Sequence, residues 1–361
     1  MVDNVVVDLA YAVSGWAFFF RGGNLKNDRP FKTIDDQIDG LEARGLIIES
    51  RNHTYDVLLN NNYYSVVNGY KKPFIKKDGT GKFLTPDCFI DNCKFSELFA
   101  LYKFDGELKN LLFKYLIVFE SRLKTLVAYR FCEAHCAPYD YLSVGNYSQE
   151  TEDLSNVLTN ISNLSKKIDK NKNASYDNSI KHYINEHENV PLWVLVNFLT
   201  FGELQFLFSA LDKSLKEKIC KDFSRVFKET YNSKEKIDIE EMQMIIKSIN
   251  LFRNVCAHDE VLYNYCLQKK IKLSLFDKYY KDNSKFKNIS KASKTDIFVL
   301  ISLLKLVLRN KEFKEFLYGM KTLQKKYRNK FRCVPFEELL GMMGFPQNWE
   351  DKLEIKVNIK K

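Results

Sequence analysis

An arginine, an asparagine and a histidine stand close together in residues 251–260, LFRNVCAHDE. His258 follows Arg253 by five residues, and Asn254 lies between them. A histidine can move protons near neutral pH, and a guanidinium can hold a phosphate and offset charge in a transition state. An asparagine can orient the histidine or donate to a phosphate oxygen. The set therefore suits metal-independent cleavage of a phosphodiester in RNA, and we expect no metal and no cofactor.

The same spacing occurs a second time, at Arg130 and His135, so spacing alone does not identify a site. Arg130 falls on the helical stripe of Leu112 and Leu123, near a helix end, where an arginine commonly buries its stem and extends its charge to water. Context favours Arg253 and His258 as the site, and the 130/135 pair is the alternative.

A helix from Asp238 to about Gln268 is expected to carry the favoured pair. At about 100° per residue, its apolar positions form one stripe, namely Ile245, Ile249, Phe252 and Cys256. Asn254 and His258 fall on nearly the opposite side with Lys247 beside them, and Arg253 lies between the two faces. We therefore expect His258 to face solvent, another helix or another subunit.

The remaining patterns predict an all-α antiparallel bundle with no internal repeat. The strongest helix signal runs from Phe95 to about Ala134. Short helices are predicted after Thr33, with Gly45 as a stop, and from Tyr55 to Tyr64, and residues 76–92 are predicted to form a loop. Further helices are predicted from Leu154 to Ile168, as one helix from Pro191 through PLWVLVNFLTFGELQFLF, and after Thr295 as a cap.

The 361-residue chain carries a net charge of +10, which favours a polyanionic partner such as RNA. Lysines alternate with aromatics at 278–294 and 321–332, either as solvated faces or as a groove that follows a phosphate backbone. The candidate RNA-binding residues are Lys247, Lys285, Lys287, Lys325, Lys326 and Arg328.

Cysteine usage and the apolar run at residues 5–20 bear on localisation. Eight cysteines without a CxxC motif suit free thiols in a reducing compartment, and Cys132, His135 and Cys136 make only an incomplete zinc set. The run at 5–20 is too short to span a bilayer and contains Asp8. We expect a cytoplasmic protein with no membrane partner.

Several ordered blocks resemble the Abi (abortive infection) proteins of the AbiD/AbiF type, which carry a HEPN helical domain. The motif RNVCAH with Asn264 six residues later resembles the family signature, and further blocks from about 29 to 350 agree in order. These blocks are FKTIDDQIDGLEARGLII, NNYYSVVNGYKKPF, LYKFDGELKNLL with Glu120 in the same helix, PLWVLVNFLTFGEL and MGFPQNW.

The resemblance implies a HEPN ribonuclease toxin of phage defence, in which two HEPN domains pair and cleave RNA by attack of the ribose 2′-hydroxyl. Arg253 would bind phosphate, His258 would act as acid and base, and Asn254, Asn264 and Glu120 would support them. A homodimer, an RNA substrate and a noncoding RNA antitoxin are the implied partners. The implied organisation is an extension (1–28), a small helical subdomain, which could be winged-helix-like (29–94), a HEPN-like domain (95–310) and a basic segment (311–361).

Two positions depart from the family pattern. Asp259 follows His258 where a second histidine is frequent, and Val261 stands where an arginine is frequent. Glu260 stands where a second HEPN toxin type has a tyrosine, which argues against that type. Two other readings remain open: a catalytically silent RNA-binding HEPN protein, and a protein-interaction or sensor module.

Overall fold

The computed structural model describes residues 31–267, 273–282 and 295–357, and these fold as helices joined by loops, with no strand beyond isolated bridges. The all-α prediction is confirmed. The predictions for residues 1–28, Lys285 and Lys287 lie outside the described residues. No helix in the described ranges is long and apolar enough to cross a membrane. The helices are α1 (Ile34–Glu42), α2 (Arg51–Asn60), α3 (Phe95–Ala134), α4 (Leu154–Lys172), α5 (Ser179–His187), α6 (Leu192–Leu195), α7 (Phe201–Ala210), α8 (Lys213–Tyr231), α9 (Ile239–Ala257), α10 (Leu273–Tyr279), α12 (Ile297–Val307), α13 (Asn310–Tyr327) and α14 (Phe336–Met342).

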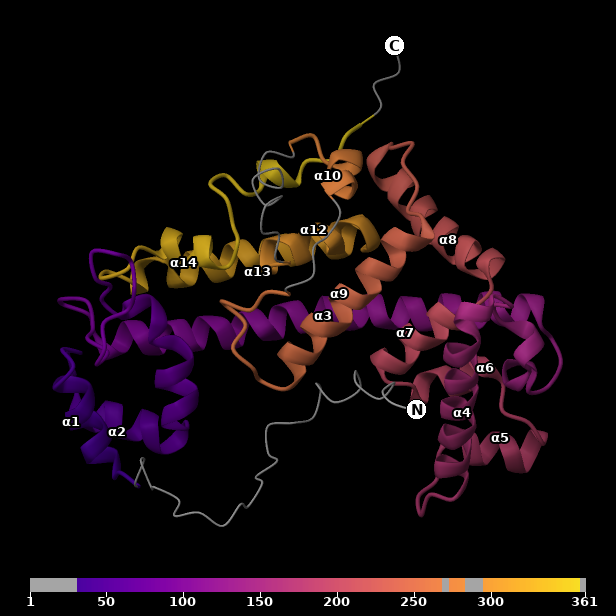
Figure 1. Ribbon diagram of the computed structural model, residues 1–361, viewed down its shortest axis with the longest axis horizontal. Helices are drawn as coiled ribbons and strands as arrows, with labels where there is room; N and C mark the ends of the chain where they lie inside the picture. Colours follow the sequence, from indigo (N-terminus) through magenta and orange to yellow (C-terminus); the bar gives the residue numbers. More distant parts are fainter. Residues whose placement is uncertain (1–30, 268–272, 283–294, 358–361) are drawn as a thin grey trace, which may run out of the picture.

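Helix α3 is the spine of the molecule. Its 40 residues extend about 60 Å at the α-helical rise, and its predicted bounds are confirmed. Figure 1 shows α1 and α2 at one end of α3, α4 to α7 at the other, and α9 crossing it between them. Helix α13 packs along a further side of α3. The core stripe of α3 is fully buried and includes Leu112, Leu116, Phe119 and Leu123.

The helix starts follow local capping chemistry. Thr33 forms a capping box with Asp36 at the start of α1, and Gly45 after the helix has φ +87°, as its sequence predicts. The second short helix begins and ends earlier than predicted, because Ser50 caps α2 and a separate π-helical turn covers Tyr64–Asn68. The loop at 76–92 is confirmed, and α4 begins at Leu154 as predicted.

The single helix predicted after Pro191 is wrong. Helix α6 ends after one turn, and the chain is extended at Leu199 before α7 begins. The physical reason is Thr200, whose side chain caps Glu203 while Glu203 accepts from the Thr200 amide, so a new helix starts there. Asp296, rather than Thr295, caps α12. Helix α8 is not among the predicted helices, although Asp212 caps it and the helix is amphipathic, with an apolar buried face.

The helix that carries the candidate site stops earlier than predicted. Helix α9 ends at Ala257 instead of reaching Gln268, with His258 as its C-cap. Asp259 adopts φ +54°, and the Glu260 amide donates to the Val255 carbonyl at 3.2 Å. This is the long hydrogen bond of a Schellman motif, which terminates a helix at a left-handed residue. Residues 259–262 therefore form a turn, and His258 stands at the helix end.

Candidate functional site

Arg253 is held against α3 by one carboxylate and one ring. Its Nε lies 3.5 Å from Oε2 of Glu120, and its guanidinium carbon lies 6.0 Å from the centre of the Phe113 ring. Glu120 is buried and also pairs with Lys124 at 3.0 Å. The Arg253 side chain is 26% exposed, and Nη1 donates to Oδ1 of Asn254 at 3.4 Å. The guanidinium is thus oriented by contacts at Nε and Nη1. Nε is buried and makes no hydrogen bond within the described residues, so the donors left for an anion are those of Nη2 and the second N–H of Nη1.

His258 is exposed at the end of α9. Its backbone amide donates to the carbonyl of Asn254 at 2.9 Å, which places the two residues on consecutive turns of the helix end. Arg253, Asn254 and Glu120 are therefore brought into contact, and His258 is tied to them through the backbone.

Lys247 and Asn264, two other predicted residues, lie on the surface on either side of the Arg253–His258 segment. Lys247 is exposed on α9, almost two turns before Asn254. Asn264 is exposed in the segment after the turn, flanked by the buried Tyr263. Neither makes a hydrogen bond to Arg253 or His258 within the described part of the chain.

The turn after His258 is anchored on Asp105 and Lys109, two charged residues of α3 that are not among the predicted site residues. Lys109 contacts the Asp259 carboxylate and donates to the Glu260 carbonyl at 3.3 Å. Oδ2 of Asp105 accepts from the Leu262 amide at 3.0 Å and from the Tyr70 hydroxyl at 2.7 Å. Burial raises the pKa of the Asp105 carboxyl. The available signal was an Asp–Lys pair at i,i+4 within an otherwise apolar helix face.

The alternative pair, Arg130 and His135, is part of a different environment. Arg130 makes two bonds of 2.7 Å to Asp222 and a further pair of bonds to Glu133, and these carboxylates raise its pKa. His135 is the C-cap of α3, its ring packs 4.8 Å from that of Phe131, and its Nε2 is buried without a partner. The guanidinium donors of Arg130 are therefore taken up by carboxylates, and Arg130 cannot bind a phosphate through two parallel N–H groups.

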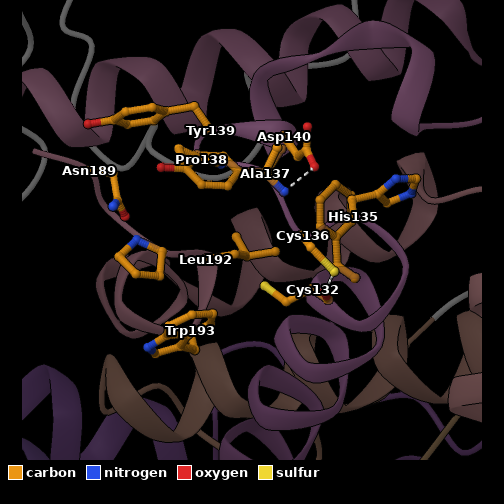
Figure 2. Close-up of a pocket in the computed structure, with 13 residues that line it drawn as sticks. Cys132, His135, Cys136, Ala137, Pro138, Tyr139, Asp140, Asn189, Leu192 and Trp193 are labelled. Carbon is orange, nitrogen blue, oxygen red and sulfur yellow. Dashed lines mark hydrogen bonds between the residues drawn. The ribbon is translucent and has the colours of Figure 1, made fainter. Parts of the chain in front are cut away.

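His135 lines a pocket of about 340 Å³ between the end of α3 and the start of α6. Figure 2 shows Tyr139, Asn189 and Trp193 around this pocket, with Cys132 and Cys136 in its wall. No group of metal-ligating side chains is assembled within the described ranges. Lys109 and Cys132 are separated by roughly 35 Å of helix, so the pocket is distant from His258.

The cations at the end of α13 are partly neutralised. Lys326 binds Glu107 at 2.6 Å, and Arg328 lies 3.5 Å from Glu337. Lys325 is exposed and lines a second pocket of about 300 Å³ with Arg328. At 100° per residue, Glu107 points to the opposite side of α3 from Lys109. The α13 cations and the His258 turn therefore attach to opposite sides of α3.

Comparison with known proteins gives one match. A family model described as Abi-like protein matches residues 56–264. The matched span contains all of α3 and α9, the turn and Asn264. No curated protein and no solved structure matches the chain.

Proposed function

The chain belongs to the Abi-like protein family, and from this premise we propose that it is a metal-independent HEPN endoribonuclease of the AbiD/AbiF type, a toxin in bacterial defence against phage. The observation that carries the proposal is the end of α9. An arginine oriented by Glu120 and Phe113 lies next to Asn254, and one helical turn later His258 is open to solvent. The family assignment supports the role in abortive infection, and the side chains support the chemistry.

The proposed reaction uses the ribose 2′-hydroxyl as nucleophile. His258 takes its proton, the 2′-oxygen bonds to phosphorus, and the bond from phosphorus to the 5′-oxygen breaks. The leaving 5′-oxygen receives a proton from a second, protonated histidine, and Arg253 balances the charge on the phosphate oxygens. The products are a 2′,3′-cyclic phosphate and a 5′-hydroxyl end.

Two histidines acting as base and acid require two copies of the site. Each chain supplies one family-type pair, so we propose a homodimer with the α9 ends of two copies facing a shared cleft. A noncoding RNA that occupies this cleft would act as an antitoxin, in keeping with the net charge of +10.

A catalytically silent RNA-binding protein is the second candidate. The observation that favours it is Asp259, an acidic residue directly after His258 whose side chain is 80% exposed even though its carboxylate contacts Lys109. Its charge would lower the local affinity for an anion. A silent protein would bind RNA with a salt-dependent affinity and leave it intact.

The deciding experiment compares His258→Ala and Arg253→Ala with wild type on labelled single-stranded RNA in the presence of EDTA. A general acid–base contributes about 10²–10⁴-fold in rate, so cleavage should fall by about that factor. The new 5′ ends of the wild-type products should accept phosphate from a polynucleotide kinase, as 5′-hydroxyl ends do.

The matched control is His135→Ala, which removes the other histidine at the same spacing and should leave cleavage unchanged. Thermal unfolding of all variants separates lost chemistry from lost fold. Wild-type rates in both His258→Ala and Arg253→Ala would refute the assignment, and binding without any cleavage by wild type would establish the second candidate.

A further inference from the structure

Two charged side chains of α3 are buried beneath the turn that follows His258. Asp105 is fully buried and the Lys109 side chain is 6% exposed. Their charged atoms lie 3.8 Å apart. A buried ion pair contributes little net stability compared with apolar residues of similar size. The contacts of this pair therefore suggest a role in fixing geometry.

Beyond their mutual contact, the polar contacts of the two side chains within the described residues lead to the turn or to the N-terminal subdomain. Lys109 contacts the Asp259 carboxylate and the Glu260 carbonyl, and Asp105 accepts the amide of Leu262. Residues 259–262 are thus held at three points over a stretch that directly follows His258. The three contacts connect positions that are about 150 residues apart in the chain.

Packing from the N-terminal subdomain closes the other side of the turn. A Cβ on Gly69 would lie 2.9 Å from Cγ2 of Val261, so the backbone approaches Val261 as closely as only glycine permits. The ring of Tyr70 stacks on that of Tyr263 at 5.5 Å, and its hydroxyl donates to Asp105. Asp259 and Val261, the two departures from the family pattern, are both contact residues of this turn.

We propose that Asp105 and Lys109 are positioning residues for His258: they clamp residues 259–262 to α3 and thereby set the direction in which the imidazole leaves the end of α9. The catalytic importance of the clamp depends on the proposed ribonuclease function. The clamp itself is a property of the fold and can be measured without activity.

A clamp is needed at this position because helix ends fray. The last four carbonyl groups of a helix lack intrahelical partners, and the side chain of a C-cap histidine would otherwise sample many directions. Catalytic groups must be held to within about 0.5 Å, and a displacement of 1 Å can lower the rate by about 10²-fold. An ion pair with a buried lysine restricts the turn more than solvent contacts would.

Asp259→Asn is the most direct variant. Asparagine adopts the left-handed conformation readily, so the turn can still form while the charge that pairs with Lys109 is lost. Lys109→Met removes the other partner and keeps an unbranched stem. Lys103→Met is the matched control, because Lys103 is an exposed lysine on the same helix.

The first readout is structural. The His258 imidazole resonances, assigned by their loss in His258→Ala, should shift in Asp259→Asn and in Lys109→Met. Exchange of the Glu260 and Leu262 amides should accelerate on the order of tenfold, as expected for local opening. The double variant should resemble the more severe single variant, because the two residues act through one contact. Lys103→Met should match wild type in both measurements.

The second readout is kinetic. Asp259→Asn should lower kcat by about 10- to 100-fold and change KM little, because Arg253 still binds the phosphate. An unchanged His258 resonance and unchanged amide exchange in Asp259→Asn would overturn the clamp, whatever the rates are. Cleavage by His258→Ala at the wild-type rate would instead refute the ribonuclease proposal, while the resonance and exchange data would still decide the clamp.

Discussion

Arg130 and Arg253 each precede a histidine by five residues, and both histidines are helix C-caps. The two arginines differ in how many carboxylate contacts they make and how close these contacts are. Arg130 is bound at 2.7 Å through two nitrogens by Asp222, whereas Arg253 has one carboxylate oxygen at 3.5 Å and a ring beside it. His135 is packed against Phe131, whereas His258 is exposed.

The difference teaches that the partner of an arginine, rather than its spacing from a histidine, decides what it can bind. A fork that is fully occupied by carboxylates is a structural cross-link between helices. A fork that is oriented by one shared carboxylate and an aromatic ring keeps donors for an incoming anion. The two pairs therefore offer matched positions for testing which of them is chemically active.

The largest expected effect is a difference in reactivity between two cysteines, Cys256 near the Arg253 pair and Cys136 beside His135. Burial, followed by the nearby Asp105 charge, raises the pKa of Cys256 to about 12. Because the thiolate is the reactive form and its fraction at pH 8 is about 10³-fold lower for Cys256 than for an ordinary thiol with pKa near 9, Cys256 should react more slowly than such a thiol. Cys136, beside His135, is exposed. Timed alkylation with peptide mapping by mass spectrometry should modify Cys136 well before Cys256.

The pH dependence of this reaction has a defined sign. Below a thiol pKa the thiolate fraction grows about tenfold per pH unit, so Cys256 labelling should keep accelerating up to about pH 12. The experiment stays below the pH at which the protein unfolds. Labelling of Cys256 as fast as Cys136 at pH 8 would show that the end of α9 opens freely and that the two pairs do not differ in burial.

The next effect concerns stability. Arg130→Met leaves the Asp222 side chain, which is 9% exposed, as an unpaired buried charge, and should lower the free energy of unfolding by about 3 kcal/mol. Arg253→Met leaves Glu120 still paired with Lys124, and should lower it by about 1 kcal/mol. Chemical denaturation of both variants provides the comparison. If Arg253→Met were the more destabilising of the two, Arg253 would be the structural residue.

The smallest effect concerns the basic end of α13. With His258→Ala as the background, Lys325→Ala should reduce the slope of log affinity against log salt by about 0.7 for single-stranded RNA, which corresponds to one phosphate contact. Lys326→Ala should change the slope less, because Glu107 already neutralises this lysine. Fluorescence anisotropy across a salt series measures both slopes. Equal slopes for His258→Ala alone and for His258→Ala combined with Lys325→Ala would show that Lys325 makes no phosphate contact.

Local signals allowed much of the fold to be predicted. The bounds of α3 follow from its apolar stripe, and Thr33 marks the start of α1. The unbroken apolar run after Pro191 predicts one helix and gives no sign that a new helix begins after Thr200. The capping pair of Thr200 and Glu203 is nevertheless present in the sequence. The early end of α9 was harder to foresee, since Asp259 is neither the glycine nor the asparagine that usually marks a left-handed helix stop.

The site was only partly accessible from sequence for a related reason. Arg253, Asn254 and His258 are close in the chain, so helical spacing could relate them. The contacts that fix the turn join Lys109 to Asp259 and Asp105 to Leu262, and no periodicity within one helix reports such pairs. Whether Arg130 can bind an anion likewise depends on Asp222, which is 92 positions away in the chain.

The number of residues between Lys109 and Glu120 sets the angle between these two side chains around the axis of α3. These eleven positions span about 16 Å and fix the angle between the residue that grips the turn and the residue that orients Arg253. One inserted residue would rotate Glu120 by about 100° around the helix axis and separate it from Arg253, although both ends of the helix would still fold. An insertion of seven residues would nearly restore the angle but would move Glu120 by about 10 Å along the axis. The site therefore tolerates substitutions along this stretch far better than any change in its number of residues.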